Sequence, residues 1–195
     1  MKAYYDARAA EYDEWYEGLG RFDGLERPAW DDELRALERV LAALPPARTL
    51  DVACGTGFLT RHLRGDVVGL DSSAAMLEIA RGRVPGAELV HGDALGLPFA
   101  DGSFDRVLTA HFYGHLEGAE RRTFLGEARR VAPEIVIVDS AIRADRRPVE
   151  WQERVLNDGS SWTVYKRYFD PELLVEELGS GRVTFAGRWF LVVAS

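Results

Sequence analysis

The sequence is poor in the residues that build covalently linked or metal-held frameworks. Its 195 residues include one cysteine, Cys54, and four histidines. A single cysteine excludes an internal disulfide and any site made of several cysteines, which fits a reducing compartment. Only His111 and His115 form a close histidine pair, and Gly114 between them disfavours the helix that an i,i+4 ligand pair requires. We therefore expect no metal site.

An excess of positive charge and a long apolar run are also missing. The 24 lysines and arginines face 32 aspartates and glutamates, for a formal net charge of −8. This balance provides no overall field that attracts the phosphates of a nucleic acid. No apolar stretch approaches the ~20 residues that span a bilayer, and the opening MKAYYDARAAEYDEWYEG is too charged for a signal peptide. We expect a cytoplasmic protein that binds neither nucleic acid nor membrane.

What the sequence does contain is the usual composition of a folded domain, with 47% hydrophobic and 29% charged residues. The length fits one domain spanning 1–195. Aromatic residues at helical spacing in 4–16, and an amphipathic pattern from Pro28 to Leu44, predict an N-terminal helical cap over 1–45.

From residue 46 to 140 short apolar runs alternate with helical patterns. The runs that predict strands are 49–53, 66–71, 87–92, 104–110 and 134–140. Helices fit between most of them, at about 57–64, 73–83 and 118–131. Nearly continuous apolar strands that alternate with helices indicate a parallel sheet covered on both faces. We therefore expect an α/β fold of the Rossmann-like, three-layer type.

The last third of the chain divides into two parts. Charges and aromatics mix without a clean period in 141–169, which we interpret as a lid or substrate region. A helix capped by Asp170 and two strands turning near Ala186-Gly187 follow in 170–195. An antiparallel hairpin there would complete a mostly parallel, seven-stranded sheet.

Three successive strands carry ligand-binding features where each strand ends. Small residues, ACGTG at 53–57, follow the first strand and let a ligand approach the backbone N–H groups. Asp71 ends the second strand, and Asp93 follows the third. Open α/β sheets bind ligands beyond the carboxyl ends of their strands. Each feature alone also suits an ordinary turn or helix cap, so the inference depends on their conjunction at one edge.

The sequence resembles the class I S-adenosylmethionine-dependent methyltransferases, of the small-molecule type 11 and type 25 kind. LDVACGTGF, VVGLDSSAAML and VHGDALGLPFADGSFDRVLTAH match the family's successive motifs, and YDARAAEYD matches its aromatic helix over the cofactor. One departure is Ala53, which stands where the family usually has the first of three glycines. The resemblance implies methyl transfer from S-adenosylmethionine to a small-molecule acceptor.

The resemblance also implies which residues bind the cofactor. It assigns the backbone of Ala53, Cys54 and Gly55 to the methionine and sugar portion, and Asp71 to the ribose hydroxyls. Ser72 and Met76 would surround the adenine, and Asp93 and the Ala94 N–H would pair with its polar edge. Ala110 would contact the amino-acid end, and Tyr12 would close over it.

Two other functions remain open at this point. A nicotinamide dehydrogenase would use the same architecture, but its GxGxxG fingerprint has Thr60 at the third position here. A protein that keeps the cofactor pocket as a binding or regulatory module, without catalysis, would carry the same motifs. Methyl transfer demands alignment rather than a specific catalytic dyad, so the sequence does not separate these cases.

Candidate catalytic groups follow the fourth predicted strand. His111 and His115 lie in TAHFYGHLEG on the cofactor side of the sheet, and histidine is the usual proton acceptor near neutral pH. A packing or capping role is the alternative for both. Aromatic residues and cations in 1–28 and 141–169, among them Arg143 and Lys166, would suit an apolar acceptor with an acidic group, or form a solvated face. The chain could be a monomer or a homodimer.

Overall fold

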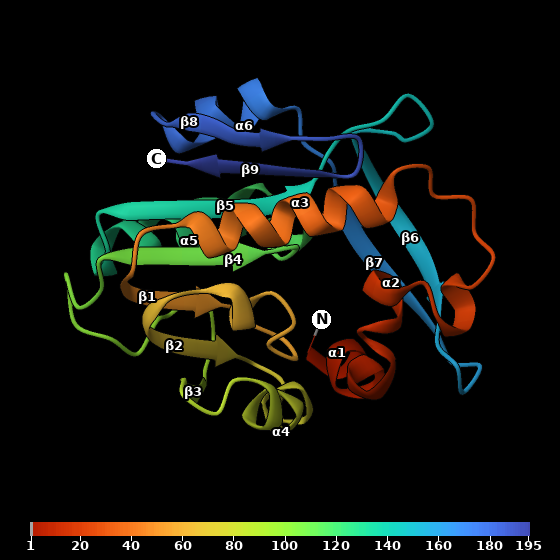
Figure 1. Cartoon of the computed structure of the whole chain (residues 1–195), viewed down its shortest axis with the longest axis horizontal. Helices are drawn as coiled ribbons and strands as arrows, with labels where there is room; N and C mark the ends of the chain where they lie inside the picture. The colour runs from red at the N-terminus through yellow and green to blue at the C-terminus, as the bar shows by residue number, and fades with distance from the viewer. Residues whose placement is uncertain (1) are drawn as a thin grey trace.

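Seven strands form the central sheet of the computed structural model, which describes residues 2–195 (Figure 1). In their order across the sheet they are β3 (Glu88–His91), β2 (Gly65–Asp71), β1 (Ala47–Val52), β4 (Arg106–Ala110), β5 (Glu134–Ser140), β9 (Phe190–Ala194) and β8 (Arg182–Ala186). The first five are parallel, and β9 runs antiparallel to both of its neighbours. The predicted mostly parallel sheet with a closing hairpin is confirmed.

The order of the strands creates the place where a ligand binds. From β1 the chain moves outward to β2 and β3, then returns to pair β4 on the other side of β1. The connections therefore leave β1 and β4 toward opposite edges, and their carboxyl ends border a crevice. The predicted glycine turn follows β1, and His111 follows β4.

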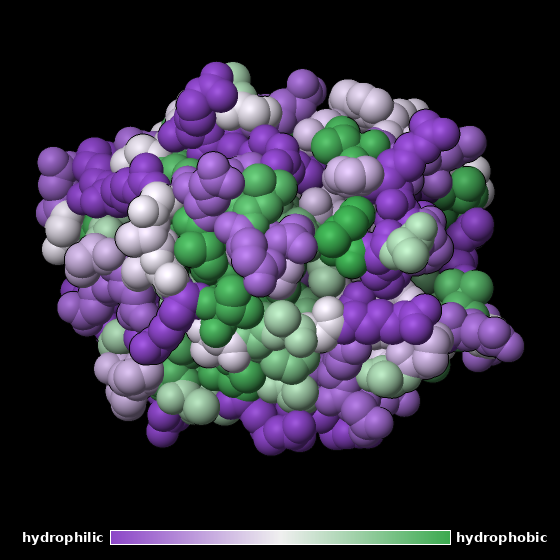
Figure 2. Space-filling view, turned by 90° about the horizontal axis from the view of Figure 1, so that it is seen from above, coloured by the Kyte–Doolittle hydropathy of each residue, from purple (hydrophilic) through white to green (hydrophobic). Residues whose placement is uncertain are grey.

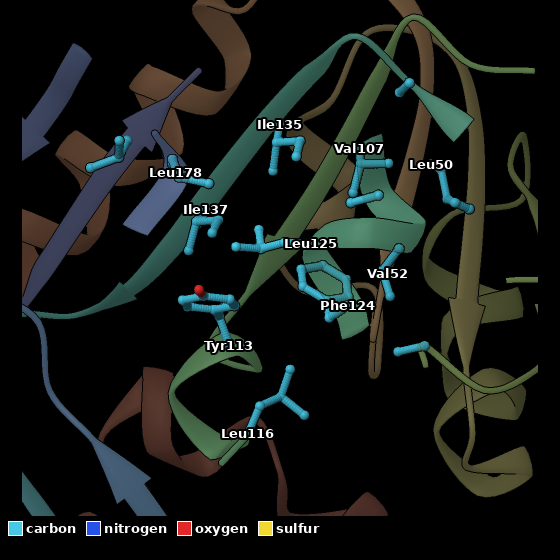
Figure 3. Close-up of a cluster of buried hydrophobic side chains, with 14 of the residues drawn as sticks. Leu50, Val52, Val107, Tyr113, Leu116, Phe124, Leu125, Ile135, Ile137 and Leu178 are labelled. Atoms are coloured by element: carbon cyan, nitrogen blue, oxygen red, sulfur yellow. The ribbon is translucent and has the colours of Figure 1, made fainter. Parts of the chain in front are cut away.

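Helices cover both faces of the sheet because the strands are apolar on both sides. The larger helices are α3 (Trp30–Ala43), α4 (Ala74–Arg83), α5 (Gly118–Val131) and α6 (Pro171–Leu178). In β5, Ile135 and Ile137 join the core cluster that contains Phe124 of α5, as Figure 3 shows. Val136 on the opposite face joins the cluster that contains Leu37 of α3. Burying side chains of this size contributes about 1.5–3 kcal/mol each.

The N-terminal segment differs from the single helix expected over 4–16. It consists of α1 (Lys2–Arg8), the 3-10 turn η1 (Ala9–Glu11) and the short α2 (Glu14–Glu17), followed by η2 (Gly20–Phe22). The tighter turn between α1 and α2 brings Asp13 to Thr56, whose Oγ1 donates a 2.6 Å hydrogen bond to Asp13 Oδ1. This tertiary contact competes with a continuous helix.

The helix expected at 57–64 is wrong. Only a single 3-10 turn, η3 (Thr60–His62), forms between β1 and β2. Gly57 takes a left-handed φ of 75°, and Leu63 is already extended. Too few residues remain between these two points for a helix of the usual length.

A second, two-stranded sheet occupies the region without a clean sequence period. β6 (Val149–Val155) and β7 (Ser161–Arg167) pair antiparallel and run beside the N-terminal helices (Figure 1). Tyr4 of α1 packs against Leu156 and Val164 of this hairpin. The remaining turn, η4 (Tyr113–His115), follows β4. The division of the chain into cap, core, lid and closing segments remains a prediction.

The outer surface mixes hydrophilic and hydrophobic side chains. Figure 2 views the face where β8 and α6 lie, and hydrophobic side chains gather in its middle inside a hydrophilic border. Val183 of β8 and Leu173 of α6 are among the exposed large hydrophobic residues. Within residues 2–195 no helix combines the length and the apolar character needed to cross a bilayer.

Candidate functional site

The turn after β1 has backbone angles that ordinary residues avoid. Ala53, Gly55 and Gly57 have φ values of 58°, 56° and 75°. Glycine adopts this left-handed region without cost, whereas Ala53 holds it at a cost of about 1–2 kcal/mol. Ala53 stands where the family usually has glycine, and its backbone keeps a glycine-like conformation. The turn therefore keeps its open shape.

Asp71 connects the end of β2 to this turn. Its Oδ2 accepts a 2.9 Å hydrogen bond from the Gly55 N–H, and its Oδ1 accepts a 2.8 Å bond from the Ser73 N–H. Burial raises the pKa of the Asp71 carboxyl, although these hydrogen bonds act in the opposite direction. Each oxygen retains a further lone pair for a ligand hydroxyl. The position fits a group that recognises a diol.

The other residues of the expected cofactor set lie along the same edge. Met76 is buried in α4, and the Ser72 carbonyl is 2.9 Å from His91 Nε2. Asp93 is exposed after β3, where its Oδ1 accepts a hydrogen bond from the Leu95 N–H, and Ala94 is buried beside it. Ser72 and Met76 thus follow β2, the latter within α4, and Asp93 and Ala94 follow β3; their roles in binding remain predictions.

A narrow hollow of about 10 Å³ lies directly above the glycine turn. Ala53, Cys54 and Ala110 form part of its wall, with Tyr12 and Tyr16 as its aromatic roof. The Tyr12 ring lies over Gly55, 3.7 Å from where a Cβ would stand. A space of this size holds about one water molecule, so a nucleoside can enter only when the aromatic roof moves.

One acidic residue of this hollow, Asp51, was not among the site residues expected from the sequence. Asp51 of β1 is 2% exposed, and its Oδ2 accepts a 2.6 Å hydrogen bond from Thr60 Oγ1. Its Oδ1 is buried without a partner among the described residues. Burial raises the pKa of Asp51 to about 7. An acid inside the apolar run TLDVA was the signal that could have identified it.

The pKa of Asp51 predicts how the stability of the free protein depends on pH. Because the folded-state pKa of about 7 lies above the ordinary aspartate pKa of 3.8, the folded state binds more protons than the unfolded state between these two pH values. Stability therefore falls as pH rises from about 4 to 7, by on the order of 1 kcal/mol per pH unit at most. Chemical unfolding at pH 5 and pH 8 measures this difference. It should shrink in Asp51→Asn and persist in Asp101→Asn, an exposed control; an unchanged difference in Asp51→Asn would contradict the assignment.

His111 follows β4 and is held in an unusual state. Its φ is 55°, and its ring packs edge-on against Trp15 at 4.9 Å and near Phe190. Both ring nitrogens are buried and lack a hydrogen-bond partner within residues 2–195. Burial lowers the pKa of His111 to about 4, so the imidazole is neutral near pH 7. Neutral imidazole carries one nitrogen that accepts a hydrogen bond.

A much larger cavity of about 760 Å³ begins at the same aromatic roof. Tyr12 lines both cavities, and His111 and His115 line the larger one. Its walls come from the N-terminal segment, from the β6–β7 hairpin and from the ends of β4 and β5. The volume suits a small organic molecule.

His115 occupies a different environment from His111. Its Nδ1 lies 2.7 Å from the Tyr165 carbonyl, so the Nδ1 proton is donated there and Nε2 is left as an acceptor. Burial, together with the nearby charges of Lys166, Arg154 and Arg8, lowers the pKa of His115 well below its usual value. The structure therefore brings both predicted histidines to one cavity, in the neutral form.

Comparison with known proteins identifies the family. A family model described as a methyltransferase domain matches residues 50–134. A solved structure titled as a complex of DhpI with S-adenosylhomocysteine is 30% identical, covers 98% of this chain and 92% of that chain, and has a TM-score of 0.76. The chain belongs to the class I S-adenosylmethionine-dependent methyltransferases. A second structure, titled as DhpI with S-adenosylmethionine and HEP, is 28% identical with a TM-score of 0.78.

Curated methyltransferases show a shorter match. The demethylmenaquinone methyltransferase of Thermotoga maritima is 42% identical over 102 residues, which cover 50% of this chain and 43% of that protein. An uncharacterized methyltransferase of Alkaliphilus oremlandii is 32% identical over 115 residues. The chain matches about half the length of these curated relatives or less. Membership in the methyltransferases replaces the dehydrogenase interpretation and assigns S-adenosylmethionine as cofactor.

The donor set of the narrow hollow fits this cofactor. S-adenosylmethionine carries a ribose diol and two cationic centres. The hollow offers Asp51 Oδ1, which has no partner among residues 2–195, and the Asp71 carboxylate adjoins the same turn through its hydrogen bond with the Gly55 N–H. Cys54 is packed against Gly69, where an added Cβ would come within 2.9 Å of Cys54 Sγ, and burial raises the pKa of the thiol. Within residues 2–195 no three histidine, cysteine or acidic side chains are grouped to hold a metal ion.

Proposed function

We propose that this chain transfers the methyl group of S-adenosylmethionine to a small-molecule acceptor held in the larger cavity. One observation carries the proposal: Tyr12 lines both cavities, so the narrow hollow over the glycine turn meets the larger cavity at one side chain. Donor and acceptor bound in these two places would face each other there. The names of the curated relatives support a small organic acceptor.

The residues at the strand ends would hold the donor. The backbone of Ala53, Cys54 and Gly55 would cradle its methionine and sugar portion, and Asp71 would accept hydrogen bonds from the ribose. Asp51 Oδ1 would pair with the donor's positive charge. When bound, the cofactor supplies an activated methyl group on a good leaving group, so the protein has only to align the reactants and exclude water.

At the adenine end, Ser72, Met76, Asp93 and Ala94 would form the surround. Asp93 is the exposed acid of this group, and the Ala94 N–H is the donor that the resemblance assigns to a ring nitrogen. Ala110, which lines the narrow hollow, would contact the amino-acid end.

His111 would receive the proton of the acceptor. Its ring is neutral near pH 7, it follows Ala110 directly, and neither ring nitrogen has a hydrogen-bond partner among the described residues. An acceptor hydroxyl or amine that donates to this imidazole becomes a better nucleophile as its proton is withdrawn. Trp15 of the N-terminal segment packs edge-on against this ring. Movement of that segment would therefore expose more of the ring to an acceptor.

Methyl transfer to an extract tests the proposal. The purified protein and S-adenosylmethionine labelled in the methyl group are incubated with the small-molecule fraction of a cell extract. Label in a new small molecule, with matching S-adenosylhomocysteine, is the expected result. Binding of the cofactor without any transfer would instead support the binding-module alternative and contradict the proposal.

The N-terminal segment is fastened over the donor hollow by Asp13. Asp13 Oδ2 lies 2.6 Å from Arg83 Nη2, and its Oδ1 accepts a hydrogen bond from Thr56. Replacing Asp13 by asparagine weakens this charged attachment, so the roof opens more often. We expect association of S-adenosylhomocysteine to be accelerated by roughly three- to tenfold, as for loss of a charge-assisted contact.

Stopped-flow tryptophan fluorescence measures this rate, because Trp15 lies in the moving segment. Asp32→Asn is the matched control, since the one ion pair of Asp32 within residues 2–195 is with its helix neighbour Arg35. Equal association rates for wild type and Asp13→Asn would show that the attachment does not limit entry.

A further inference from the structure

We propose that the larger cavity contains a binding site for an anionic group, formed by Arg8, Arg154 and Lys166, so that the methyl acceptor is a small molecule with an acidic group. The inference rests on the proposed function, because it places this group on the acceptor. The three cations come from α1, β6 and β7 and all line the cavity.

Two of these cations are joined through one hydroxyl. Arg8 Nη1 donates a 2.8 Å hydrogen bond to Tyr4 Oη, and Arg154 Nη1 donates to the same oxygen at 3.4 Å. Both guanidinium groups also lie near the Tyr4 ring, at 5.7 and 5.8 Å from its centre. Two positively charged groups are thus held close to one oxygen atom. A bound anion would stabilise this arrangement, because it offsets the repulsion between the two guanidinium groups.

Neither arginine has an acidic partner in the structure of residues 2–195. Arg8 is only 8% exposed, and Arg154 is half-buried with Gln152 Oε1 as its other side-chain acceptor. Two other arginines of the same cavity differ, since Arg143 pairs with Asp145 and Arg146 lies within reach of Asp145 and Glu150. Buried charges are ordinarily paired, so Arg8 and Arg154 have unused capacity for an anion.

Lys166 adds a third donor. It is 4% exposed, and its Nζ lies 2.6 Å from Asp139 Oδ1. The Gly114 and Ser140 N–H groups also donate to the Asp139 carboxylate. Asp139 therefore fixes the position of the ammonium group. This contact uses one of the three N–H donors of the lysine. The remaining donors are available to a ligand in the cavity that Lys166 lines.

The neighbouring His115 adds no charge to this cluster of cations. Its ring is neutral because burial and the three surrounding cations oppose its protonation. Of the three cations, Lys166 pairs with Asp139, whereas the acids that line the cavity, among them Glu11, Glu150 and Glu153, form no ion pair with Arg8 or Arg154 within residues 2–195. This local excess of positive charge inside an acidic protein favours an anionic ligand over a neutral one.

Binding of simple anions tests the inference. The protein is saturated with S-adenosylhomocysteine and titrated at constant ionic strength with inorganic phosphate, with benzoate, or with uncharged benzamide. Tryptophan fluorescence reports binding, because Trp15, Trp30, Trp151 and Trp189 line the cavity. We expect saturable binding of phosphate, benzoate or both, and weaker binding of benzamide. Phosphate alone would indicate a phospho group on the acceptor, and benzoate alone a carboxylate.

Variants locate the site. Arg8→Gln and Arg154→Gln should each weaken anion binding by roughly tenfold or more, the effect of losing a charge-assisted hydrogen bond. Arg146→Gln is the matched control, because this cavity arginine already has acidic partners, and it should change affinity by less than about threefold. Calorimetric titration with S-adenosylhomocysteine checks folding and the donor site separately, and the affinity is expected to be unchanged in Arg154→Gln and Arg146→Gln. Arg8 also lies over the Tyr12 ring, 4.9 Å from its centre, so Arg154→Gln is the variant that separates the two sites.

The outcomes distinguish the two proposals. Failure of both anions to bind, or equal affinities in wild type, Arg8→Gln and Arg154→Gln, would overturn the anion site while cofactor binding stands. Loss of anion binding in these two variants, with the control unaffected, supports it. If S-adenosylhomocysteine failed to bind any of the proteins, the proposed function would fall independently of the anion titration.

Discussion

Asparagine in place of His111 is expected to lower kcat by roughly 10²–10⁴-fold, the range for losing a positioned proton acceptor. The imidazole is buried beside Trp15, has no partner for either nitrogen within residues 2–195, and lines the proposed acceptor cavity. Asparagine keeps polarity and approximate size but accepts no proton. Initial rates at saturating cofactor measure the change. His62→Asn provides the control, because His62 lies on η3 and does not line the larger cavity.

The pH dependence of the wild type gives a second view of His111. Because its pKa is lowered to about 4, the imidazole remains neutral down to about pH 5 and becomes protonated only below that. We therefore expect no decrease in kcat/KM from protonation of His111 between pH 7 and pH 6. The decrease should come as the pH falls through about 4. A loss of activity through pH 6–7 that disappears in His111→Asn would contradict the buried, neutral state.

The second large effect concerns cofactor affinity. Asp71→Ala is expected to weaken binding of S-adenosylhomocysteine by roughly 100-fold or more, because two hydrogen bonds to a charged acceptor are each worth about 1.5–3 kcal/mol. The change also removes the bonds that Asp71 accepts from Gly55 and Ser73, which hold the turn and the start of α4 together.

Calorimetric titration measures this affinity directly. Asp66→Asn is the matched control, since Asp66 lies at the opposite end of β2 and its one ion pair in the described part of the chain is an exposed contact of 3.7 Å with Arg48. Unchanged affinity in a folded Asp71→Ala protein would show that the ribose is recognised elsewhere.

Much of the sheet could be predicted because its strands are nearly continuous apolar runs. β5 was expected over 134–140 and spans Glu134–Ser140, and the Asp170 cap precedes α6 as expected. The helix at 57–64 failed because the left-handed backbone of Gly57 is not visible in an apolar pattern. Local signals thus locate elements whose burial is uniform, and they miss backbone angles imposed by a tight turn.

The site could be predicted in part for a similar reason. Asp71 and His111 directly end or follow strands, so the topology alone brings them to one edge. Arg8 and Arg154 could not be singled out, since they meet only after α1 packs against the β6–β7 hairpin. Their 146-residue separation carries no local pattern. Asp51 was visible as an acid in an apolar strand, but its unpartnered oxygen emerged only from the packing.

A crystal structure of the protein with S-adenosylhomocysteine tests the central claim most directly. The account predicts the nucleoside at the ends of β1 and β2, with both ribose hydroxyls within hydrogen-bond distance of Asp71 and with Tyr12 displaced from its position over Gly55. A nucleoside bound away from this edge, or one at this edge whose ribose makes no contact with Asp71, would contradict it.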